Sequence, residues 1–248
     1  MASRPIFIVG SERSGTTLMR SLINAHPNIS CGEETHFLAG LEGIVGSKWR
    51  LMKDYPFEKE YWYEKIRELF DSFKTEAAHK QGKLRWGDKT PIYVLKLDFI
   101  DALFPDCQVI HMIRDGRDVV ASSMDRWGYK RGLSATKRWG KSVRAGQSFG
   151  RSVSLERYIE VKYEELVLDP ESTMQSVCEF LQEPWEPSLL EEGTYKSALT
   201  EKRRQAAGNS EVSFYASRIG VGKKKLDPLV KSLFRYYSGS LLKELGYS

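Results

Sequence analysis

Residues 5–22, which read PIFIVGSERSGTTLMRSL, decide the fold. The stretch opens with the apolar run Ile6–Val9, which predicts a buried strand that ends at Gly10. A polar loop follows, and Leu18, Met19, Leu22 and Ile23 then recur at helical spacing. A strand, a glycine-bounded loop and a helix start direct backbone N–H groups and the positive end of a helix at one spot. The stretch therefore predicts a site for a phosphate or another small oxyanion.

The loop differs from the P-loop of nucleoside triphosphatases, whose pattern is G-x-x-x-x-G-K-[ST]. Gly10 and Gly15 have the required separation, but Thr16 stands where that pattern has its lysine. The lysine reaches the terminal phosphates of a triphosphate, so its absence disfavours an ATPase, a kinase or another P-loop phosphotransferase. A cation lies inside the loop instead, at Arg13. The loop predicts an oxyanion of different shape, and the alternative is a turn that only connects strand and helix.

The composition is ordinary and excludes few functions. The chain has 248 residues, and we expect one domain over residues 1–248. Its formal net charge of +5 suits anionic ligands but is too small to indicate nucleic-acid binding. The three cysteines lack C-x-x-C spacing and indicate neither a zinc site nor a disulfide framework. Without a long apolar run or a signal-peptide pattern, the sequence as written predicts a soluble, cytoplasmic chain with no membrane segment.

Alternating strands and helices predict an α/β fold in which a P-loop-like parallel sheet is flanked by helices. Further strands are predicted at Lys83–Trp86, Gln108–Ile113 and Tyr158–Lys162. Helices are predicted at Glu58–Ala78, from Pro91 (capped by Thr90) to Leu103, at Val119–Trp127 and at Pro170–Leu181. In the first of these helices we expect one apolar stripe to be core, namely Trp62, Ile66, Leu69, Phe70 and Phe73. Polar clusters follow the strands, where open α/β sheets bind ligands.

Several short segments carry a family resemblance. They are RSGTTL at 13–18, HPN at 26–28, CGEET at 31–35, WGDKTP at 86–91, FPDCQVIHMIRDGRDVVASSM at 104–124 and KYEELVLDP at 162–170. In this order they resemble sulfotransferases that use 3′-phosphoadenosine 5′-phosphosulfate (PAPS), and most of all the tyrosylprotein sulfotransferase group. The resemblance covers most of the chain and weakens after about Leu190. It implies the sulfotransferase fold, PAPS as the sulfuryl donor and adenosine 3′,5′-bisphosphate (PAP) as the product.

The resemblance implies that Arg13, Glu34 and Lys89 are catalytic. Sulfuryl transfer resembles phosphoryl transfer in needing in-line geometry and stabilisation of a charge-spread transition state. Arg13 and Lys89 match the cations that act on the sulfuryl end of the donor. Glu34 matches the glutamate that takes the proton of the acceptor hydroxyl, and a positioned carboxylate is an adequate base. His36 is the rival base, because imidazole titrates near pH 6.5, at about neutral pH.

The resemblance also implies the nucleotide-binding residues. At the 5′ end they are Arg13, Ser14, Gly15, Thr16 and Thr17, and at the 3′-phosphate they are Arg114, Ser122 and Arg126. Ser122 and Arg126 are four residues apart on one helix face, and two arginines with a hydroxyl suit a dianion. Tyr163 matches a further nucleotide contact. The basic segment Arg218–Lys225 resembles one that closes over the nucleotide, without deciding among Lys223, Lys224 and Lys225, and a solvated loop is the alternative. No metal site is indicated.

The acceptor stays open. In tyrosylprotein sulfotransferases, arginines shortly after the catalytic glutamate bind acidic residues around the target tyrosine, whereas this chain has His36 and Gly40 at two of those positions. Gly87 stands where the resemblance implies a disulfide partner for Cys31. The acceptor is either a protein or peptide tyrosine, or a hydroxyl of a small molecule or carbohydrate.

Three further questions stay open. The first is whether the protein forms a homodimer. The second is whether it is located in the Golgi lumen, because the animal members of the group are Golgi membrane proteins and an N-terminal anchor could have been removed. The third is whether the protein binds a nucleotide without catalysing a reaction, which Arg13, Glu34 and Lys89 disfavour.

Overall fold

One parallel sheet forms the centre of the protein. The computed structural model describes residues 4–46, 48–51, 53–191 and 216–247. Within them the strands are β1 (Ile6–Gly10), β2 (Ile29–Cys31), β3 (Arg85–Lys89), β4 (Gln108–Ile113) and β5 (Tyr158–Lys162). They lie in the order β2-β3-β1-β4-β5, and all neighbouring pairs are parallel. The predicted parallel α/β sheet is confirmed, with β1 at its centre.

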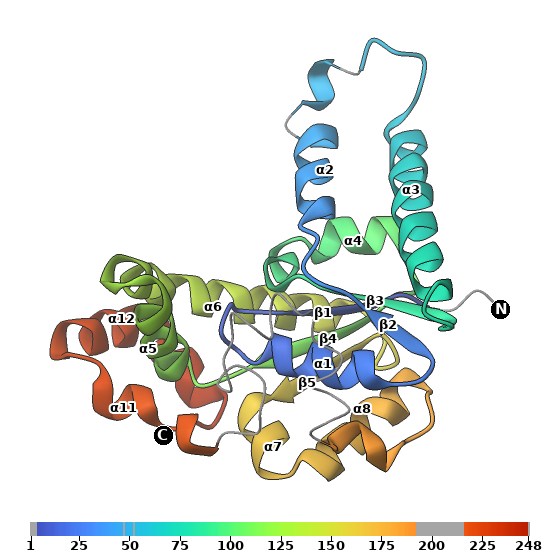
Figure 1. Ribbon diagram of the computed structural model, residues 1–248. Helices are drawn as coiled ribbons and strands as arrows, with labels where there is room; N and C mark the ends of the chain where they lie inside the picture. The colour runs from blue at the N-terminus through green and yellow to red at the C-terminus, as the bar shows by residue number, and fades with distance from the viewer. Residues whose placement is uncertain (1–3, 47, 52, 192–215, 248) are drawn as a thin grey trace.

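Helices cover both faces of the sheet and extend beyond it (Figure 1). They are α1 (Thr16–Ala25), α2 (Phe37–Val45), α3 (Lys59–His79), α4 (Leu97–Leu103), α5 (Gly116–Trp127), α6 (Tyr129–Ser152), α7 (Tyr163–Leu168), α8 (Pro170–Leu181), α11 (Val221–Lys225) and α12 (Pro228–Glu244). Short 3₁₀ turns lie at Trp49–Leu51, Pro91–Leu95, Pro187–Leu190 and Ala216–Arg218. No helix in the described part of the chain is long and apolar enough to cross a lipid bilayer.

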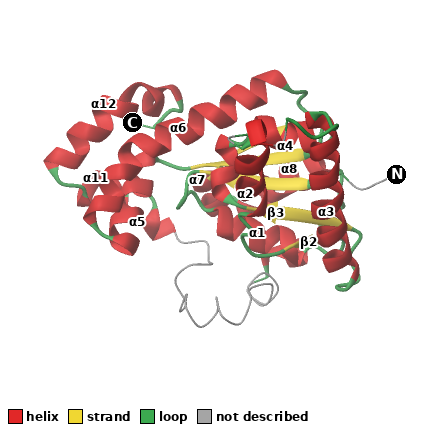
Figure 2. Ribbon diagram, turned by 90° about the horizontal axis from the view of Figure 1, so that it is seen from above, coloured by secondary structure: helices red, strands yellow, loops and turns green. Residues whose placement is uncertain are grey.

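Three apolar clusters stabilise this arrangement. One lies between the sheet and helices α1, α7 and α8, and a second lies between the opposite face and helices α3, α4 and α6. The third cluster joins α5, α6 and α12, which gather at one side of the sheet in the view from above (Figure 2). Helices α2 and α3 stand away from the sheet as a two-helix arm, and α4 lies across the base of this arm (Figure 1).

The segment around Pro91 differs from its prediction. Strand β3 was predicted to end at Trp86, but it continues to Lys89 because Gly87, Asp88 and Lys89 pair with β1. The helix predicted from Pro91 is a 3₁₀ turn followed by α4, separated at Lys96. Thr90 does not cap that turn with its side chain, because its hydroxyl donates a hydrogen bond to Asp88 at 2.8 Å.

The arm explains a second difference. Helix α3 was predicted to bury an apolar stripe, and Trp62, Ile66 and Phe70 do pack against the core. Leu69 and Phe73, however, are 57% and 52% exposed. The prediction failed for these two residues because only one side of α3 reaches the body of the protein, whereas periodicity alone assumes that a whole apolar stripe is covered.

Candidate active site

The carboxyl ends of the five strands carry the predicted site residues. The oxyanion loop follows β1, and the segment with Glu34 follows β2. Lys89 is the last residue of β3, Arg114 follows β4, and Tyr163 follows β5. Because all five strands are parallel, these ends lie along one edge of the sheet, on either side of the central strand. Site residues as far apart in sequence as Arg13 and Tyr163 therefore lie along the same edge of the sheet.

The loop after β1 has a backbone that requires glycine at two positions. Gly10 has a φ of +150°, and an added Cβ would lie 2.4 Å from the carbonyl oxygen of Met112. Gly15 has a φ of +90°, and an added Cβ would lie 2.5 Å from the Tyr163 ring. Arg13 also has a positive φ, of 72°, which is uncommon for a residue with a side chain. The loop is thus held in a specific shape by its neighbours.

This loop has unused hydrogen-bonding capacity. Ser14 is fully buried, and its hydroxyl has no hydrogen-bond partner among the described residues. No side chain of the described chain caps the N-terminus of α1, and its first turn contains no acidic residue. Buried polar groups are rarely left unpaired, and uncapped helix N-termini bind anions. Both observations fit an oxyanion such as the 5′-phosphosulfate group of PAPS.

Arg114 connects the loop with two other segments. Its guanidinium donates to the carbonyl oxygens of Arg13 (3.2 Å) and Arg218 (2.7 Å), and it stacks on the Tyr163 ring at 4.3 Å. Its Nε has no hydrogen-bond partner among the described residues. Burial raises the pKa of Tyr163, although Arg114 opposes this effect, so the phenol stays neutral as a packing surface. An arginine with an unpaired N–H at this strand end fits a phosphate ligand.

The other predicted 3′-phosphate residues lie on α5. The Arg13 side chain donates to the Ser122 hydroxyl at 3.0 Å, which brings the 5′ loop and the predicted 3′ residues together. Arg126 lies one turn further along the helix and is exposed. The basic segment forms α11, in which Lys223 and Lys224 are exposed and Lys225 pairs with Asp125 at 2.5 Å.

Two of the three predicted catalytic residues, Glu34 and Lys89, are in direct contact. One carboxylate oxygen of Glu34 accepts a hydrogen bond from the Lys89 ammonium, and the other lies 3.3 Å from His36 Nε2. Lys89 is fully buried, whereas the side chain of Glu34 is 27% exposed. Both candidate bases therefore belong to one cluster with a solvent-facing side. Glu33 has a different partner, because it lies 3.5 Å from the buried Arg20.

Two buried carboxylates near the site were missed by the sequence analysis, which did not place them among the site residues. Asp115 accepts a hydrogen bond from the backbone N–H of Arg117 at 2.8 Å and so caps α5. Asp118 accepts from the N–H groups of Gly220 (2.8 Å) and Gly222 (2.6 Å). The first role is a local cap that its position before a helix could have indicated. The second depends on residues about 100 positions away and has no local signal.

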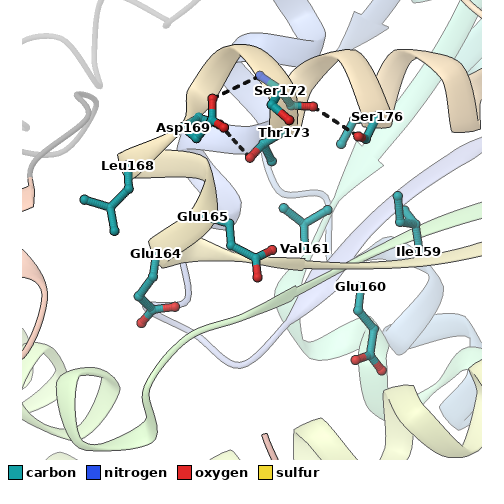
Figure 3. A pocket seen from close by; sticks show the side chains of 11 residues that line it. Ile159, Glu160, Val161, Glu164, Glu165, Leu168, Asp169, Ser172, Thr173 and Ser176 are labelled. Atoms are coloured by element: carbon teal, nitrogen blue, oxygen red, sulfur yellow. Dashed lines mark hydrogen bonds between the residues drawn. The ribbon is translucent and has the colours of Figure 1, made fainter. Parts of the chain in front are cut away.

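A separate cavity of about 400 Å³ lies outside the strand edge, between β5, α7 and α8 (Figure 3). Its lining includes the carboxylates Glu160, Glu164, Glu165 and Asp169. Asp169 accepts a hydrogen bond from the N–H of Ser172 and so caps α8. This acidic lining disfavours an anionic nucleotide in this cavity. The described residues contain no group of three or more His, Cys, Asp or Glu that could hold a metal ion.

A parallel sheet with a glycine-bounded oxyanion loop at its carboxyl edge defines the class of P-loop-like α/β proteins. Within this class, a sequence model described as "Sulfotransferase family" matches residues 5–187. The chain belongs to the sulfotransferase family, as the resemblance predicted.

Curated relatives agree with this family. Protein-tyrosine sulfotransferase A of Caenorhabditis elegans is 32% identical over 201 residues, which cover 75% of this chain and 51% of the relative. Human protein-tyrosine sulfotransferase 1 is 32% identical over 198 residues, which cover 75% of this chain and 53% of the relative. The chain therefore spans about half the length of these relatives.

Solved structures share the fold. The sulfotransferase domain of the olefin synthase of Synechococcus PCC 7002 has a TM-score of 0.69 at 22% identity and covers 95% of both chains. The sulfotransferase domain of the curacin biosynthetic pathway has a TM-score of 0.68 at 20% identity, over 96% of this chain and 97% of that one. A mouse sulfotransferase complexed with PAP has a TM-score of 0.52 at 14% identity, over 97% of this chain and 88% of that one.

Proposed function

We propose that this protein is a sulfotransferase that takes a sulfuryl group from PAPS and transfers it to an acceptor hydroxyl. The observation that carries the proposal is the contact of Glu34 with the buried Lys89, at the same strand edge as the oxyanion loop. A loop with Thr16 in place of the P-loop lysine suits a phosphosulfate better than a triphosphate. Family membership and the similarity to a structure complexed with PAP support this donor.

In this proposal the loop holds the 5′ end of the nucleotide and α5 holds the 3′-phosphate. The residues at the 5′ end are Arg13, Ser14, Gly15, Thr16 and Thr17, with the Ser14 hydroxyl available as an unpaired donor. The 3′-phosphate is bound by Arg114, Ser122 and Arg126. Tyr163 supports both ends, because its ring contacts Gly15 and stacks on Arg114.

Each catalytic residue then has a defined task. PAPS, when bound, supplies a sulfuryl group on a phosphate that leaves with increased negative charge. Arg13 and Lys89 stabilise that charge, and a preorganised donor of this kind typically contributes about 10²–10³ in rate. Glu34 accepts the acceptor's proton on a carboxylate oxygen. His36, 3.3 Å from the same carboxylate, is the alternative base.

We propose a protein or peptide tyrosine as the acceptor, which the names of the curated relatives support. A specific observation favours a second candidate, a small apolar molecule with a hydroxyl. Near Glu34 the arm exposes apolar side chains, among them Phe37 at 38% and Phe73 at 52%. Two nearby cations that could bind an acidic peptide already pair with carboxylates: Arg20 with Glu33 at 3.5 Å, and Lys96 with Glu42 at 2.6 Å.

A thermal shift panel tests the donor. PAP should raise the melting temperature at concentrations where ATP with magnesium does little, because a ligand that binds only the folded state stabilises it. At a PAP concentration of 100 times its dissociation constant, the stabilisation should be about 2.7 kcal/mol. Equal or greater stabilisation by ATP with magnesium would refute the donor assignment. Measuring the transfer of labelled sulfate from PAPS to a tyrosine peptide and to a small phenol then decides between the two acceptors.

A further inference from the structure

A buried ion pair links helix α3 of the arm to Asp88, the residue before Lys89 on β3. The ammonium of Lys74, on α3, lies 3.3 Å from the carboxylate of Asp88, on β3. Lys74 is 6% exposed and Asp88 is fully buried. Burying two charges has a large desolvation penalty, so such a pair is weak evidence for stability and calls for another role.

A chain of hydrogen bonds leads from Asp88 to the segment with Glu34. The same oxygen of Asp88 that faces Lys74 accepts from the Thr35 hydroxyl at 3.1 Å. The Thr35 hydroxyl lies 3.3 Å from that of Tyr93, which accepts from the backbone N–H of Leu38 at 2.9 Å. Burial raises the pKa of Tyr93, so its phenol keeps the proton that it can donate.

The direction of this chain is set by its end groups. An N–H can only donate and an ionised carboxylate can only accept. With Leu38 donating to Tyr93, and Asp88 accepting from Thr35, a hydrogen bond between the two hydroxyls runs from Tyr93 to Thr35. Hydrogen bonds aligned in this way strengthen each other. Lys74 faces the same carboxylate oxygen of Asp88 that accepts from Thr35.

The segment held by these hydrogen bonds is attached through its side chains, because Glu33 also pairs with Arg20 and Glu34 with Lys89. Residues 32–36 belong to no helix or strand, and they carry Glu34 directly before Thr35. Helix α2 begins immediately afterwards, at Phe37, whose N–H lies 3.4 Å from the Thr35 hydroxyl. Thr35 is thus the point at which the base-bearing segment is fastened to the strand that ends in Lys89.

We infer that Asp88, paired with Lys74, is a positioning residue that orients Glu34 through Thr35 and ties the arm helix α3 to the catalytic pair. This inference rests on the proposed function, because only that function makes Glu34 and Lys89 a catalytic pair. The linkage from Asp88 through Thr35 to the Glu34 segment does not depend on it. Asp88 does not touch the reacting atoms. Its contribution is that Glu34 is held toward Lys89 before the acceptor binds.

The test is Thr35→Val, which removes the hydroxyl at nearly constant size. A misplacement of about 1 Å can cost about 10²-fold in rate, so we expect kcat to fall roughly 10- to 100-fold. The acceptor KM and the dissociation constant for PAP should change by less than about twofold, since neither ligand contacts Thr35 in the proposal. Thr35→Ser, which keeps the hydroxyl, should restore most of kcat.

Thr136→Val is the matched control. Thr136 is more buried than Thr35, and its hydroxyl donates to the carbonyl oxygen of Leu133 at 2.6 Å within α6. This variant should lose a hydrogen bond of similar kind without changing kcat. Hydrogen–deuterium exchange provides a readout independent of activity, because Thr35→Val should speed exchange over residues 33–40 and Thr136→Val should not.

The possible results separate the two claims. The inference is overturned if Thr35→Val keeps the wild-type kcat, if Thr35→Ser is no better than Thr35→Val, or if exchange over residues 33–40 is unchanged. Tyr93→Phe, which removes the next hydroxyl of the chain, gives the same decision should Thr35→Val not fold. If the wild-type protein transfers no sulfuryl group, the proposed function is what fails, and the exchange measurement still decides the linkage.

Discussion

Gly15→Ala is the substitution for which the structure gives the sharpest expectation. Gly15 has a φ of +90°, and an added Cβ would lie 2.5 Å from Cδ2 of Tyr163. Gly82 is the matched control, because its φ is +70° and no atom lies within 4 Å of an added Cβ. Both alanines adopt left-handed backbone, which costs about 1–2 kcal/mol. Only the alanine at position 15 must also move a ring.

The size of the difference follows from that ring. A Cβ at 2.5 Å is well inside ordinary contact, so Tyr163 has to shift. Overpacking of this kind typically costs about 1–3 kcal/mol. Gly15→Ala should therefore lower the free energy of unfolding by about 1–3 kcal/mol more than Gly82→Ala does. Because Arg114 stacks on the same ring at 4.3 Å, the shift should also disturb the predicted nucleotide site.

Urea denaturation of the two variants measures the first effect, and calorimetry with PAP measures the second. Gly82→Ala should bind PAP like the wild type, whereas Gly15→Ala should bind it roughly tenfold more weakly or worse, which corresponds to a loss of about 1.4 kcal/mol. If both variants were equally stable and bound PAP equally well, the contact of Gly15 with Tyr163 would have no role in shaping the loop. The support for a nucleotide at this loop would then be reduced, within the described residues, to the unpaired Ser14 hydroxyl and the uncapped start of α1.

Three further predictions concern the base, the 3′-phosphate and pH. Glu34→Gln should lower turnover by about 10²–10⁴ while PAP binding stays unchanged; retention of most of the rate would point to His36, with His36→Asn as the next variant. Arg126→Ala should weaken PAP binding roughly 10- to 100-fold in calorimetry but adenosine 5′-monophosphate binding far less, and equal losses would remove Arg126 from the 3′-phosphate site. Burial lowers the pKa of His111 to about 3, so between about pH 6.5 and pH 5 only the unfolded chain takes up this proton. Acidification over that range should therefore cost about 2 kcal/mol of stability, and urea titrations should show a smaller loss for His111→Gln than for the wild type.

Much of the strand edge could be predicted from sequence, because its signals are local. Strands β1, β4 and β5 appear where short apolar runs end at polar clusters, and a parallel sheet brings such ends to one edge. Arg13 and Ser122 are in contact at 3.0 Å, and Glu34 contacts Lys89. The family resemblance identified these residues as site residues, and the structure adds that they are in contact in these pairs.

The parts that could not be predicted depend on contacts between distant segments. Asp118 looks like an ordinary helix charge, yet it is buried because two backbone N–H groups about 100 residues later bond to it. Leu69 and Phe73 fit a core stripe, yet they are exposed because α3 leaves the body of the protein. The exposure of Lys74 differs from expectation in the opposite direction. A lysine in an amphipathic helix is expected at the surface, yet Lys74 is only 6% exposed. Periodicity describes one element and has no information about what covers it.

The register of β2 and β3 connects the missing disulfide with the buried ion pair. Cys31 and Gly87 are paired across these strands, and an added Cβ at Gly87 would lie 3.2 Å from the Cys31 sulfur. A second cysteine at this position, as the resemblance implies, would join the strand before Glu34 to the strand that ends in Lys89. This chain has glycine there, and Cys31 is a buried thiol whose pKa burial raises to about 11. The bond from Thr35 to Asp88 joins the same two segments without a covalent link, and Lys74 joins helix α3 to the same carboxylate. The relative position of Glu34 and Lys89 then depends on hydrogen bonds and charge, which makes Asp88 the residue whose loss should loosen this site most.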